Sequence, residues 1–287
     1  MKKYLVLYNP LSRKGHGKEA AEKVEAYLRN PEVTYEDITE IEDPMAYICA
    51  VPQDVTVIFT GGDGTLNKVV NAMKKSGITR DVYYFPAGSG NDFMNDIERN
   101  RDCGPFPINA YIKYLPEVRV NGQTYKFING VGFGLDGYCC EENDRLKSIG
   151  KRRSYVMVAF LGLMGKFKPV NAKITVDGDT REFDHVYMVP TMFGRFYGGG
   201  VKITPDQDRH NPEHAVTCAA VFSKSKIAAL IAFLSVCKGK GPKLPKHLYY
   251  WVGHEVHVEF DRPTALQIDG ETVVNVLTYD VSTDRES

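Results

Sequence analysis

A glycine turn that contains one acid, residues 61–65, is the part of the sequence whose residue types most directly suggest chemistry. It reads Gly-Gly-Asp-Gly-Thr, directly after the apolar run 55–59 and before helix-like apolar spacing over 66–73. Glycines without Cβ let backbone N–H groups approach an anion, and the following helix adds unpaired amides and the positive end of its dipole. The carboxylate of Asp63 would repel a phosphate unless a cation neutralises it or it faces a substrate hydroxyl. The turn therefore favours phosphoryl transfer over simple phosphate binding.

Two further loops have the same place between a strand-like run and a helix. Residues 9–18 read Asn-Pro-Leu-Ser-Arg-Lys-Gly-His-Gly-Lys, and residues 86–93 read Pro-Ala-Gly-Ser-Gly-Asn-Asp-Phe. Each loop alone could be a solvated turn, and residues 61–65 alone could be an ordinary strand-to-helix connection with Thr65 near the N-cap. Parallel strands, however, end at one edge of their sheet, where the ligands of α/β folds bind. Three such loops at one edge together predict a phosphate-binding site.

Two segments of the second half also have a suggestive composition, but each has an ordinary explanation. Residues 267–271 read Gln-Ile-Asp-Gly-Glu, and Asp-Gly between two strand patterns is typical of a hairpin turn. Residues 195–200 read Arg-Phe-Tyr-Gly-Gly-Gly, where the glycines would allow the close approach of a ligand or of a partner strand. By themselves these residues do not discriminate between a site and a turn.

The order of the predicted elements indicates two domains that differ in secondary structure. Strand-like and helix-like runs alternate up to residue 85, which predicts an N-terminal doubly wound α/β domain, residues 1–117. From about residue 118, Asn-Gly and Asp-Gly turns separate strand-like runs, which predicts a mainly antiparallel β-sandwich domain, residues 118–276. The tail 277–287 could pack back on the first domain. The elements predicted for the first domain are strands 4–8, 33–36, 55–59 and 82–85, and helices 18–28, 44–50 and 66–73.

Charge and composition exclude some classes of partner. Lysine and arginine number 36, as do aspartate and glutamate, so no global field attracts nucleic acid. The cysteines form no Cys-x-x-Cys pair and the N-terminus lacks the apolar stretch of a signal peptide, which favours a cytoplasmic location. No apolar run approaches the roughly 20 residues that span a bilayer. The runs 155–164 and 227–237 are bounded by cations and are interpreted as half-buried helices, with membrane-surface helices as the alternative.

With its segments in this order, the chain resembles the diacylglycerol kinase catalytic-domain family of lipid kinases, which includes sphingosine kinases and small two-domain bacterial enzymes. The first domain of this family is similar to that of NAD kinases. The Gly-Gly-Asp-Gly turn also occurs in NAD kinases and 6-phosphofructokinases, but the Thr-Gly-Ser-Thr-Ala-Tyr and Asp-Asn-Asp segments expected of those two families are not found. The resemblance runs nearly end to end, and it is carried by the Asn9-Pro10 glycine loop, residues 61–67, residues 88–93, the Gly-Phe-Gly-Leu-Asp segment 132–136, the Tyr-Gly-Gly-Gly segment 197–200, and Asp269-Gly270-Glu271.

The resemblance implies a kinase that uses ATP and Mg²⁺ to phosphorylate a lipid hydroxyl, most simply of diacylglycerol or a related amphiphile that arrives in the interdomain cleft. It makes Asp269 a candidate general base with Glu271 beside it. Asp63 would serve the nucleotide, the Mg²⁺ or the acceptor hydroxyl, so whether Asp63 or Asp269 is the base stays open. Asp136 is a candidate Mg²⁺ ligand together with Asp63. The implied ATP-binding residues are Asn9, Lys14, Gly61, Gly62, Gly64, Thr65, Ser89, Gly90 and Asn91.

One segment departs from the family pattern. After the Ile-Thr-Pro of residues 203–205, relatives usually show an Asp-Gly-Leu stretch that helps to form a structural Mg²⁺ site, whereas here Asp206 is followed by Gln207 and Asp208. This departure puts a structural Mg²⁺ at Asp206 and Asp208 in question. The alternatives to a lipid kinase are a kinase for a soluble hydroxyl acceptor and a non-catalytic regulator that binds a nucleotide or a lipid. A peripheral contact with the inner membrane surface and a homodimer stay open.

Overall fold

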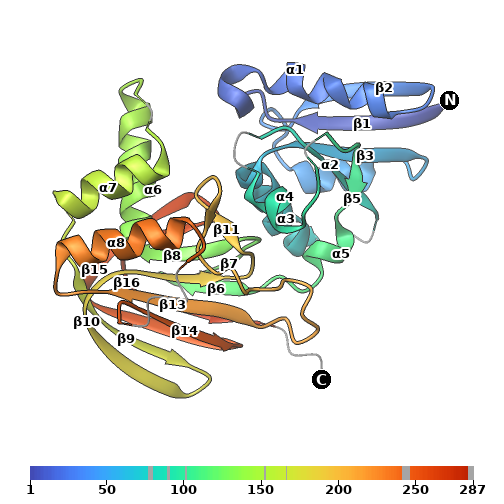
Figure 1. The fold of residues 1–287 in the computed structure, drawn as a ribbon. Coiled ribbons are helices and arrows are strands. Elements are labelled where there is room, and N and C mark those ends of the chain that lie inside the picture. Colours follow the sequence, from blue (N-terminus) through green and yellow to red (C-terminus); the bar gives the residue numbers. More distant parts are fainter. Residues whose placement is uncertain are drawn as a thin grey trace. The chain divides into compact units, whose positions relative to one another are not determined.

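The chain folds into two compact units, Met1–Lys113 and Tyr114–Ser287, whereas the sequence placed the boundary after residue 117. The computed structural model describes residues 1–76, 80–88, 91–100, 102–151, 153–165, 167–240 and 246–283. The first unit contains a mainly parallel sheet with helices, and the second contains a larger antiparallel sheet (Figure 1). The predicted fold class, an α/β domain followed by a mainly antiparallel β-rich domain, is confirmed.

The first unit is built on a five-stranded sheet of order β2-β1-β3-β4-β5. The first four strands pair in parallel and the short β5 is antiparallel to β4, so β1 to β4 all end at the same edge. Its strands are β1 (Lys2–Tyr8), β2 (Pro31–Asp37), β3 (Val55–Gly61), β4 (Val82–Pro86) and β5 (Phe106–Pro107). Its helices are α1 (Gly17–Glu22), α2 (Pro44–Ala50), α3 (Asp63–Ser76), α4 (Asp92–Asp96) and α5 (Asn109–Ile112), with the 3₁₀ helices η1 (Ser12–Gly15) and η2 (Lys23–Tyr27).

Apolar side chains on both faces of this sheet are buried, as is typical of parallel strands covered by helices. Val6 of β1 and Ile58 of β3 form one apolar cluster with Ala21 of α1. Their neighbours Leu7 and Phe59 point to the opposite face, because side chains alternate along a strand, and both are fully buried. Helices α2 and α3 pack against each other, and α3 also contacts β3. The helices therefore hold β1 and β3 in fixed positions.

The second unit is built on a nine-stranded sheet in which β9 pairs with both β10 and β15. The turns at 121–122, 177–178 and 269–270 join consecutive strands, and both residues of each turn have positive φ, as two-residue type I′ hairpins require. The two hairpins predicted from Asn-Gly and Asp-Gly are thus present. The strands are β6 (Glu117–Val120), β7 (Gln123–Lys126), β8 (Gly130–Gly134), β9 (Val170–Val176), β10 (Asp179–Met192), β13 (Val216–Phe222), β14 (Leu248–Gly253), β15 (Glu255–Ile268) and β16 (Glu271–Ser282), with the separate pair β11 (Phe196–Tyr197) and β12 (Val201–Lys202).

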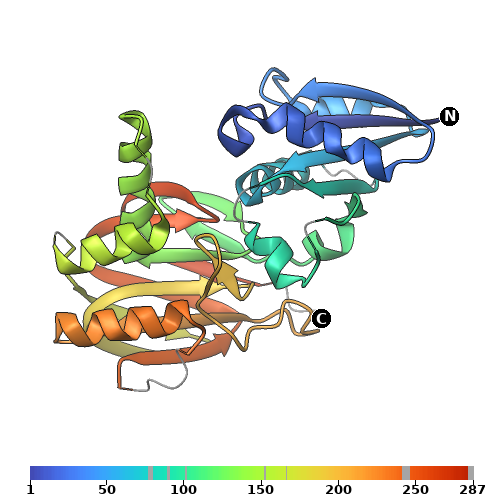
Figure 2. The same ribbon diagram turned by 45° about the horizontal axis from the view of Figure 1, so that its top comes forward.

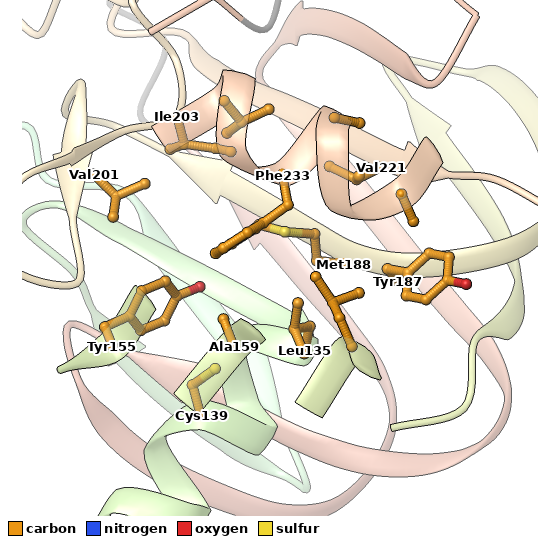
Figure 3. Close-up of a cluster of buried hydrophobic side chains, with 14 of the residues drawn as sticks. Leu135, Cys139, Tyr155, Ala159, Tyr187, Met188, Val201, Ile203, Val221 and Phe233 are labelled. Atoms are coloured by element: carbon orange, nitrogen blue, oxygen red, sulfur yellow. The ribbon is translucent and has the colours of Figure 1, made fainter. Parts of the chain in front are cut away.

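Three helices lie together on one side of this sheet: α6 (Leu135–Ser148), α7 (Tyr155–Met164) and α8 (Lys226–Cys237) (Figures 1 and 2). Their inner faces meet in one apolar cluster that also contains Met188 of β10. Figure 3 shows Cys139 of α6, Tyr155 and Ala159 of α7, and Phe233 of α8 gathered in this cluster. The predicted helices over 155–164 and 227–237 are confirmed.

The C-terminal strand completes the second sheet. Strand β16 pairs with β15 and, through residues 279–282, with β6. Tyr279 and Val281 are buried, and this fixes the register because a slip by one residue would expose both. Residues 277–282, which the sequence left free to pack on the first domain, therefore belong to the second unit.

Candidate functional site

The loop after β1 is shaped by a side chain that bonds its own backbone. Oδ1 of Asn9 accepts a hydrogen bond from the N–H of Leu11 (2.9 Å), and its carbonyl oxygen accepts one from the N–H of Ser12 (3.0 Å). A Cβ on Gly17 would lie 1.9 Å from the carbonyl oxygen of Asn9, so only glycine fits where helix α1 begins. Lys14 belongs to η1 by its backbone, and its side chain is outside the part of the chain that the structure describes.

The turn after β3 and the loop after β4 pack backbone against backbone. The carbonyl oxygen of Gly61 accepts hydrogen bonds from the N–H of Ala87 (2.8 Å) and from the hydroxyl of Tyr84 (2.9 Å). A Cβ on Gly88 would lie 2.3 Å from Cα of Gly62, a distance that no side chain can occupy. The two glycines thus let the loops of neighbouring strands meet at the same edge of the sheet.

The carboxylate of Asp63 joins these two loops. Its Oδ2 accepts a hydrogen bond from the N–H of Asp92 (2.8 Å) and its Oδ1 one from the N–H of Phe93 (2.9 Å). These are backbone donors of the first turn of α4, which lack partners within that helix. Asp63 therefore has a structural task, because it fixes the start of α4 against the start of α3.

A buried amide oxygen lies beside the two packed glycines. Asn91 is 2% exposed and has a left-handed backbone (φ 51°), and its Nδ2 donates to the carbonyl oxygen of Gly88 (3.2 Å). Its Oδ1 finds no hydrogen-bond donor within the described ranges, and a Cβ on Gly88 would lie only 2.5 Å from it. A buried acceptor of this kind calls for a donor from a bound molecule or water. The predicted residues Ser89 and Gly90 lie outside the described residues.

A cleft of about 230 Å³ opens at the edge where β1 and β2 end. Asn9 and Thr65, both predicted site residues, contribute to its wall. Thr39 is oriented by Asp37, whose Oδ1 accepts hydrogen bonds from the N–H (2.8 Å) and the hydroxyl (2.7 Å) of Thr39. The lining residues are Asn9, Ile38, Thr39, Pro44, Thr65, Lys68, Val69 and Ala72.

In the second unit, Asp269 is the centre of a dense set of backbone hydrogen bonds. Its Oδ2 accepts from the N–H of Ile128 (2.6 Å), and its Oδ1 accepts from the N–H groups of Asn129 (2.8 Å) and Gly130 (3.0 Å). The β15–β16 turn that carries Asp269 is thereby tied to the start of β8. Glu271, by contrast, is exposed at the first residue of β16. The turn predicted from Asp-Gly is present. In addition, the Asp269 side chain forms hydrogen bonds to residues distant in the sequence, which a hairpin turn does not require.

The segment with the altered Asp-Gly-Leu pattern is held by polar side chains of the protein. Arg209 is buried, and its Nη2 donates to the carbonyl oxygen of Ile128 (3.2 Å) and to Oδ1 of Asn129 (3.3 Å). Nε2 of Gln207 donates to the carbonyl oxygen of Ala215 (2.9 Å). Arg209 thus contacts the same loop that the carboxylate of Asp269 binds.

These contacts do not fit a structural Mg²⁺ at Asp206 and Asp208. Both residues are exposed, and Oδ1 of Asp208 accepts from the N–H of His210 within its own turn (2.9 Å). Among the described residues, no group of three or more His, Cys, Asp or Glu side chains is arranged to hold a metal ion. The only charged side chain that the described contacts of this segment bury is the cation of Arg209, which would not help to bind a divalent cation.

Asp136 lies in the apolar cluster under α7 and α8. It is fully buried, and its Oδ1 accepts hydrogen bonds from the hydroxyls of Tyr155 and Tyr197, the latter at 2.7 Å. The two hydroxyls are also in contact (2.9 Å). Burial raises the pKa of Asp136 to about 7, while the hydroxyl donors act in the opposite direction. The surroundings support a structural tie between α6, α7 and β11 rather than a solvated metal ligand.

The structure groups the predicted residues within each unit. In the first unit Asn9 and Thr65 line one cleft, and Asp63 is bonded to the segment that follows Asn91. In the second unit Asp269 contacts the start of β8, whereas the carboxyl of Asp136 lies over Gly132.

Sequence reasoning missed three residues of this arrangement. Thr39 could have been found because it follows β2 at the same sheet edge, and Lys68 because it lies one helical turn after Thr65. Arg209 carries no comparable signal, because its contacts depend on a loop that is 80 residues away in the sequence.

Comparisons with known proteins give two family matches. Residues 3–113 match the family described as diacylglycerol kinase catalytic domain. Residues 129–280 match the family described as YegS C-terminal NAD kinase beta sandwich-like domain, which is more than half of the chain.

The similar proteins bear kinase names. The chain is 23% identical over 280 residues to a diacylglycerol kinase of Bacillus subtilis, covering 94% of this chain and 90% of that protein. It is 24% identical over 249 residues to a diacylglycerol kinase of Mycobacterium tuberculosis, covering 83% and 79%. It spans about half (53%) of another B. subtilis relative, named "Putative lipid kinase YtlR", at 27% identity over 52% of this chain. A solved diacylglycerol kinase structure from Bacillus anthracis shares the fold, with a TM-score of 0.63, 17% identity, and coverage of 99% of this chain and 94% of that one.

Proposed function

The chain belongs to the family of lipid kinases with a diacylglycerol kinase catalytic domain, and we propose that it transfers the γ-phosphate of ATP to the hydroxyl of a lipid. The acceptor in this proposal is diacylglycerol or a related amphiphile, the class named by its relatives. One observation carries the proposal: two glycine loops pack against each other where β3 and β4 end, at the sheet edge that also holds the cleft.

The cleft supports the binding of part of a nucleotide. Its volume of about 230 Å³ is below the roughly 300–1,000 Å³ of sites that enclose a whole ligand, so it suits the base and ribose. Ile38 and Val69 offer apolar contact to the faces of a base, and the hydroxyl of Thr39 offers a polar contact to its edge. The cation of Lys68 complements a phosphorylated ligand in charge.

The glycine turn supports the placement of the phosphates. Helix α3 begins at Asp63 and has 14 residues, so its N-terminus provides unpaired amides and a favourable dipole. Oδ1 of Asn91 is an acceptor, so it suits a ribose hydroxyl or a bound water rather than a phosphate oxygen. Mg²⁺ supplied with ATP would neutralise the phosphate charge that Asp63 otherwise repels.

For the proton acceptor we assign Glu271, with Asp269 as a positioning residue. Both oxygens of Asp269 already accept backbone N–H bonds, which leaves fewer lone pairs for an acceptor hydroxyl. Glu271 is exposed directly after the turn that Asp269 fixes. A base so placed would take the proton of the attacking hydroxyl while the phosphoryl group is transferred.

The test is transfer of labelled γ-phosphate from Mg²⁺-ATP to diacylglycerol, monoacylglycerol and sphingosine in mixed micelles, and to glycerol and nucleosides in solution. Label in a lipid product is the expected result. Label only in a soluble product would replace the proposal by a kinase for a soluble acceptor. Saturable ATP binding without transfer to any acceptor would indicate a non-catalytic regulator.

A further inference from the structure

Positive charge is concentrated in two segments of a chain that is neutral as a whole. Residues 147–168 contain six lysines and arginines and no acid, namely Lys147, Lys151, Arg152, Arg153, Lys166 and Lys168. Residues 223–246 likewise contain six lysines and no acid, namely Lys224, Lys226, Lys238, Lys240, Lys243 and Lys246. The first segment includes α7 and the second includes α8.

The same two helices carry most of the large apolar side chains that the second unit exposes. Helix α7 exposes five and helix α8 exposes three, each at least 36% exposed, and Ile149 precedes α7 with 54% exposure. Elsewhere in the chain such residues are scattered, which is ordinary for a protein surface. The apolar residues exposed on the two helices are Val156, Met157, Phe160, Leu161 and Met164 of α7, and Ile227, Ile231 and Leu234 of α8.

The exposed faces belong to two adjacent and firmly anchored helices. Helices α7 and α8 contact each other, and the rings of Tyr155 and Phe233 lie 6.4 Å apart in the buried cluster of Figure 3. Each helix begins with a serine cap: Oγ of Ser154 accepts from the N–H of Met157 and Oγ of Ser225 from the N–H of Ala228. The inner faces thus fix both helices next to each other. The exposed apolar side chains of the two helices are together called the α7–α8 face.

We propose that the α7–α8 face docks on an anionic lipid bilayer. Apolar side chains of a surface helix enter the boundary between head groups and acyl chains, and lysines and arginines at its rim attract anionic head groups. No helix in the described ranges is long and apolar enough to cross a membrane. The inference rests on the proposed function, because a kinase with a lipid acceptor must reach that lipid in a membrane.

Charge argues against a second copy of the chain as the occupant of this face. A two-fold contact would bring the same surface of both copies together, and two rims of lysines and arginines would then face each other. An anionic bilayer complements both the apolar centre and the cationic rim.

The test measures co-sedimentation of the full chain with vesicles of phosphatidylcholine alone or with phosphatidylglycerol, in the absence of ATP. Binding to the anionic vesicles that weakens with salt is expected. The double variant Leu161→Gln/Ile231→Gln should bind them at least about tenfold more weakly. Its matched control is Val252→Gln/Leu277→Gln, which changes two similarly exposed apolar residues away from the face and should bind like the wild type.

A second pair of variants tests the cationic rim. Reversing four exposed cations, Lys151, Arg153, Lys238 and Lys240, to glutamate should weaken binding to anionic vesicles at least about 30-fold. The control reverses four exposed cations elsewhere and changes the net charge equally: Lys2, Lys23, Arg29 and Arg119. Unchanged thermal unfolding of each variant shows that the fold is intact.

Three results would overturn the inference: wild-type protein that ignores anionic vesicles, face variants that bind like their controls, or face variants that change the oligomeric state instead. Its failure and that of the proposed function are separable. Vesicle binding without any lipid phosphorylation would refute only the kinase proposal. Phosphorylation of a short-chain acceptor in solution without vesicle binding would refute only the docking face.

Discussion

Replacing Asp136 by asparagine is expected to flatten the pH dependence of folding stability. Burial raises the pKa of Asp136 from 3.8 to about 7, so the folded state holds a proton that the unfolded state has released over this range. A raised folded-state pKa gives a contribution that is complete below about pH 4 and is lost as the pH rises through about 7. Asparagine keeps the shape and an acceptor for the two tyrosine hydroxyls, but it does not titrate.

The expected magnitude follows from the shift of about three pKa units, each worth about 1.4 kcal/mol. Between pH 5 and pH 8 the Asp136 contribution to the free energy of unfolding falls by about 2.5 kcal/mol. The buried amide of the variant costs free energy of its own, but this cost is the same at both pH values. The comparison of the two pH values therefore isolates the carboxyl.

The assay is urea unfolding at pH 5, 6, 7 and 8, followed by the fluorescence of Trp251. This is the single tryptophan of the chain, and it is buried in β14, so it reports on the second unit. Asp184→Asn removes an exposed acid of the same unit and serves as the control, which should keep the pH dependence of the wild type. If Asp136→Asn also keeps that dependence, the carboxyl is not held protonated by its surroundings and the reasoning is refuted.

Three further predictions concern the packing of the glycine loops, the contacts of Arg209 and the cleft of the first unit. Gly88→Ala places a Cβ against the backbone of Gly62, so it should lower the free energy of unfolding of the first unit by about 1–3 kcal/mol and should also weaken ATP binding. Wild-type values in both measurements would contradict the packing described. Arg209→Gln should lower the free energy of unfolding by about 1.5–3 kcal/mol, because it removes the hydrogen bonds of a buried cation. A chelator should leave the melting temperature of the wild type unchanged. A melting temperature that falls with the chelator would instead indicate a structural metal. Thr39→Val should weaken ATP binding, measured by calorimetry, about tenfold, which is about 1.4 kcal/mol. The control Thr124→Val removes an exposed hydroxyl of the second unit and should not change the affinity. Equal affinities of the two variants would remove Thr39 from the nucleotide site.

The fold was predictable where local patterns decide it. The apolar runs of β1 and β3 predict buried parallel strands. The pairs Asn121-Gly122 and Asp177-Gly178 predict hairpins, because they tolerate the positive φ that two-residue turns require. Helix α3 begins earlier than its apolar spacing predicts, because the N–H of Leu66 already bonds the carbonyl oxygen of Gly62. The first and last residues of a helix depend on single hydrogen bonds of this kind, which the periodicity of apolar residues does not reveal.

The tasks of the site residues were much less predictable. The sequence points to Asp63 and Asp269 as acids of the chemistry, but their backbone donors lie about 30 and 140 residues away. Only the folded chain shows that both carboxylates tie loops together. The presence of these two acids therefore does not distinguish a kinase from a non-catalytic binder, and the exposed Glu271 becomes the more informative residue.

Lipid kinase activity is tested by the rate of labelled phosphate transfer from ATP to diacylglycerol. The rate is compared between the wild type, Glu271→Gln and the control Glu259→Gln, which changes an exposed acid of β15. Labelled lipid is expected from the wild type and the control. Glu271→Gln should lose at least about 100-fold in rate at unchanged ATP affinity, which is about the contribution of a general base. Wild-type turnover by Glu271→Gln would contradict the assigned base. No labelled lipid from the wild type, despite saturable ATP binding, would contradict the kinase itself.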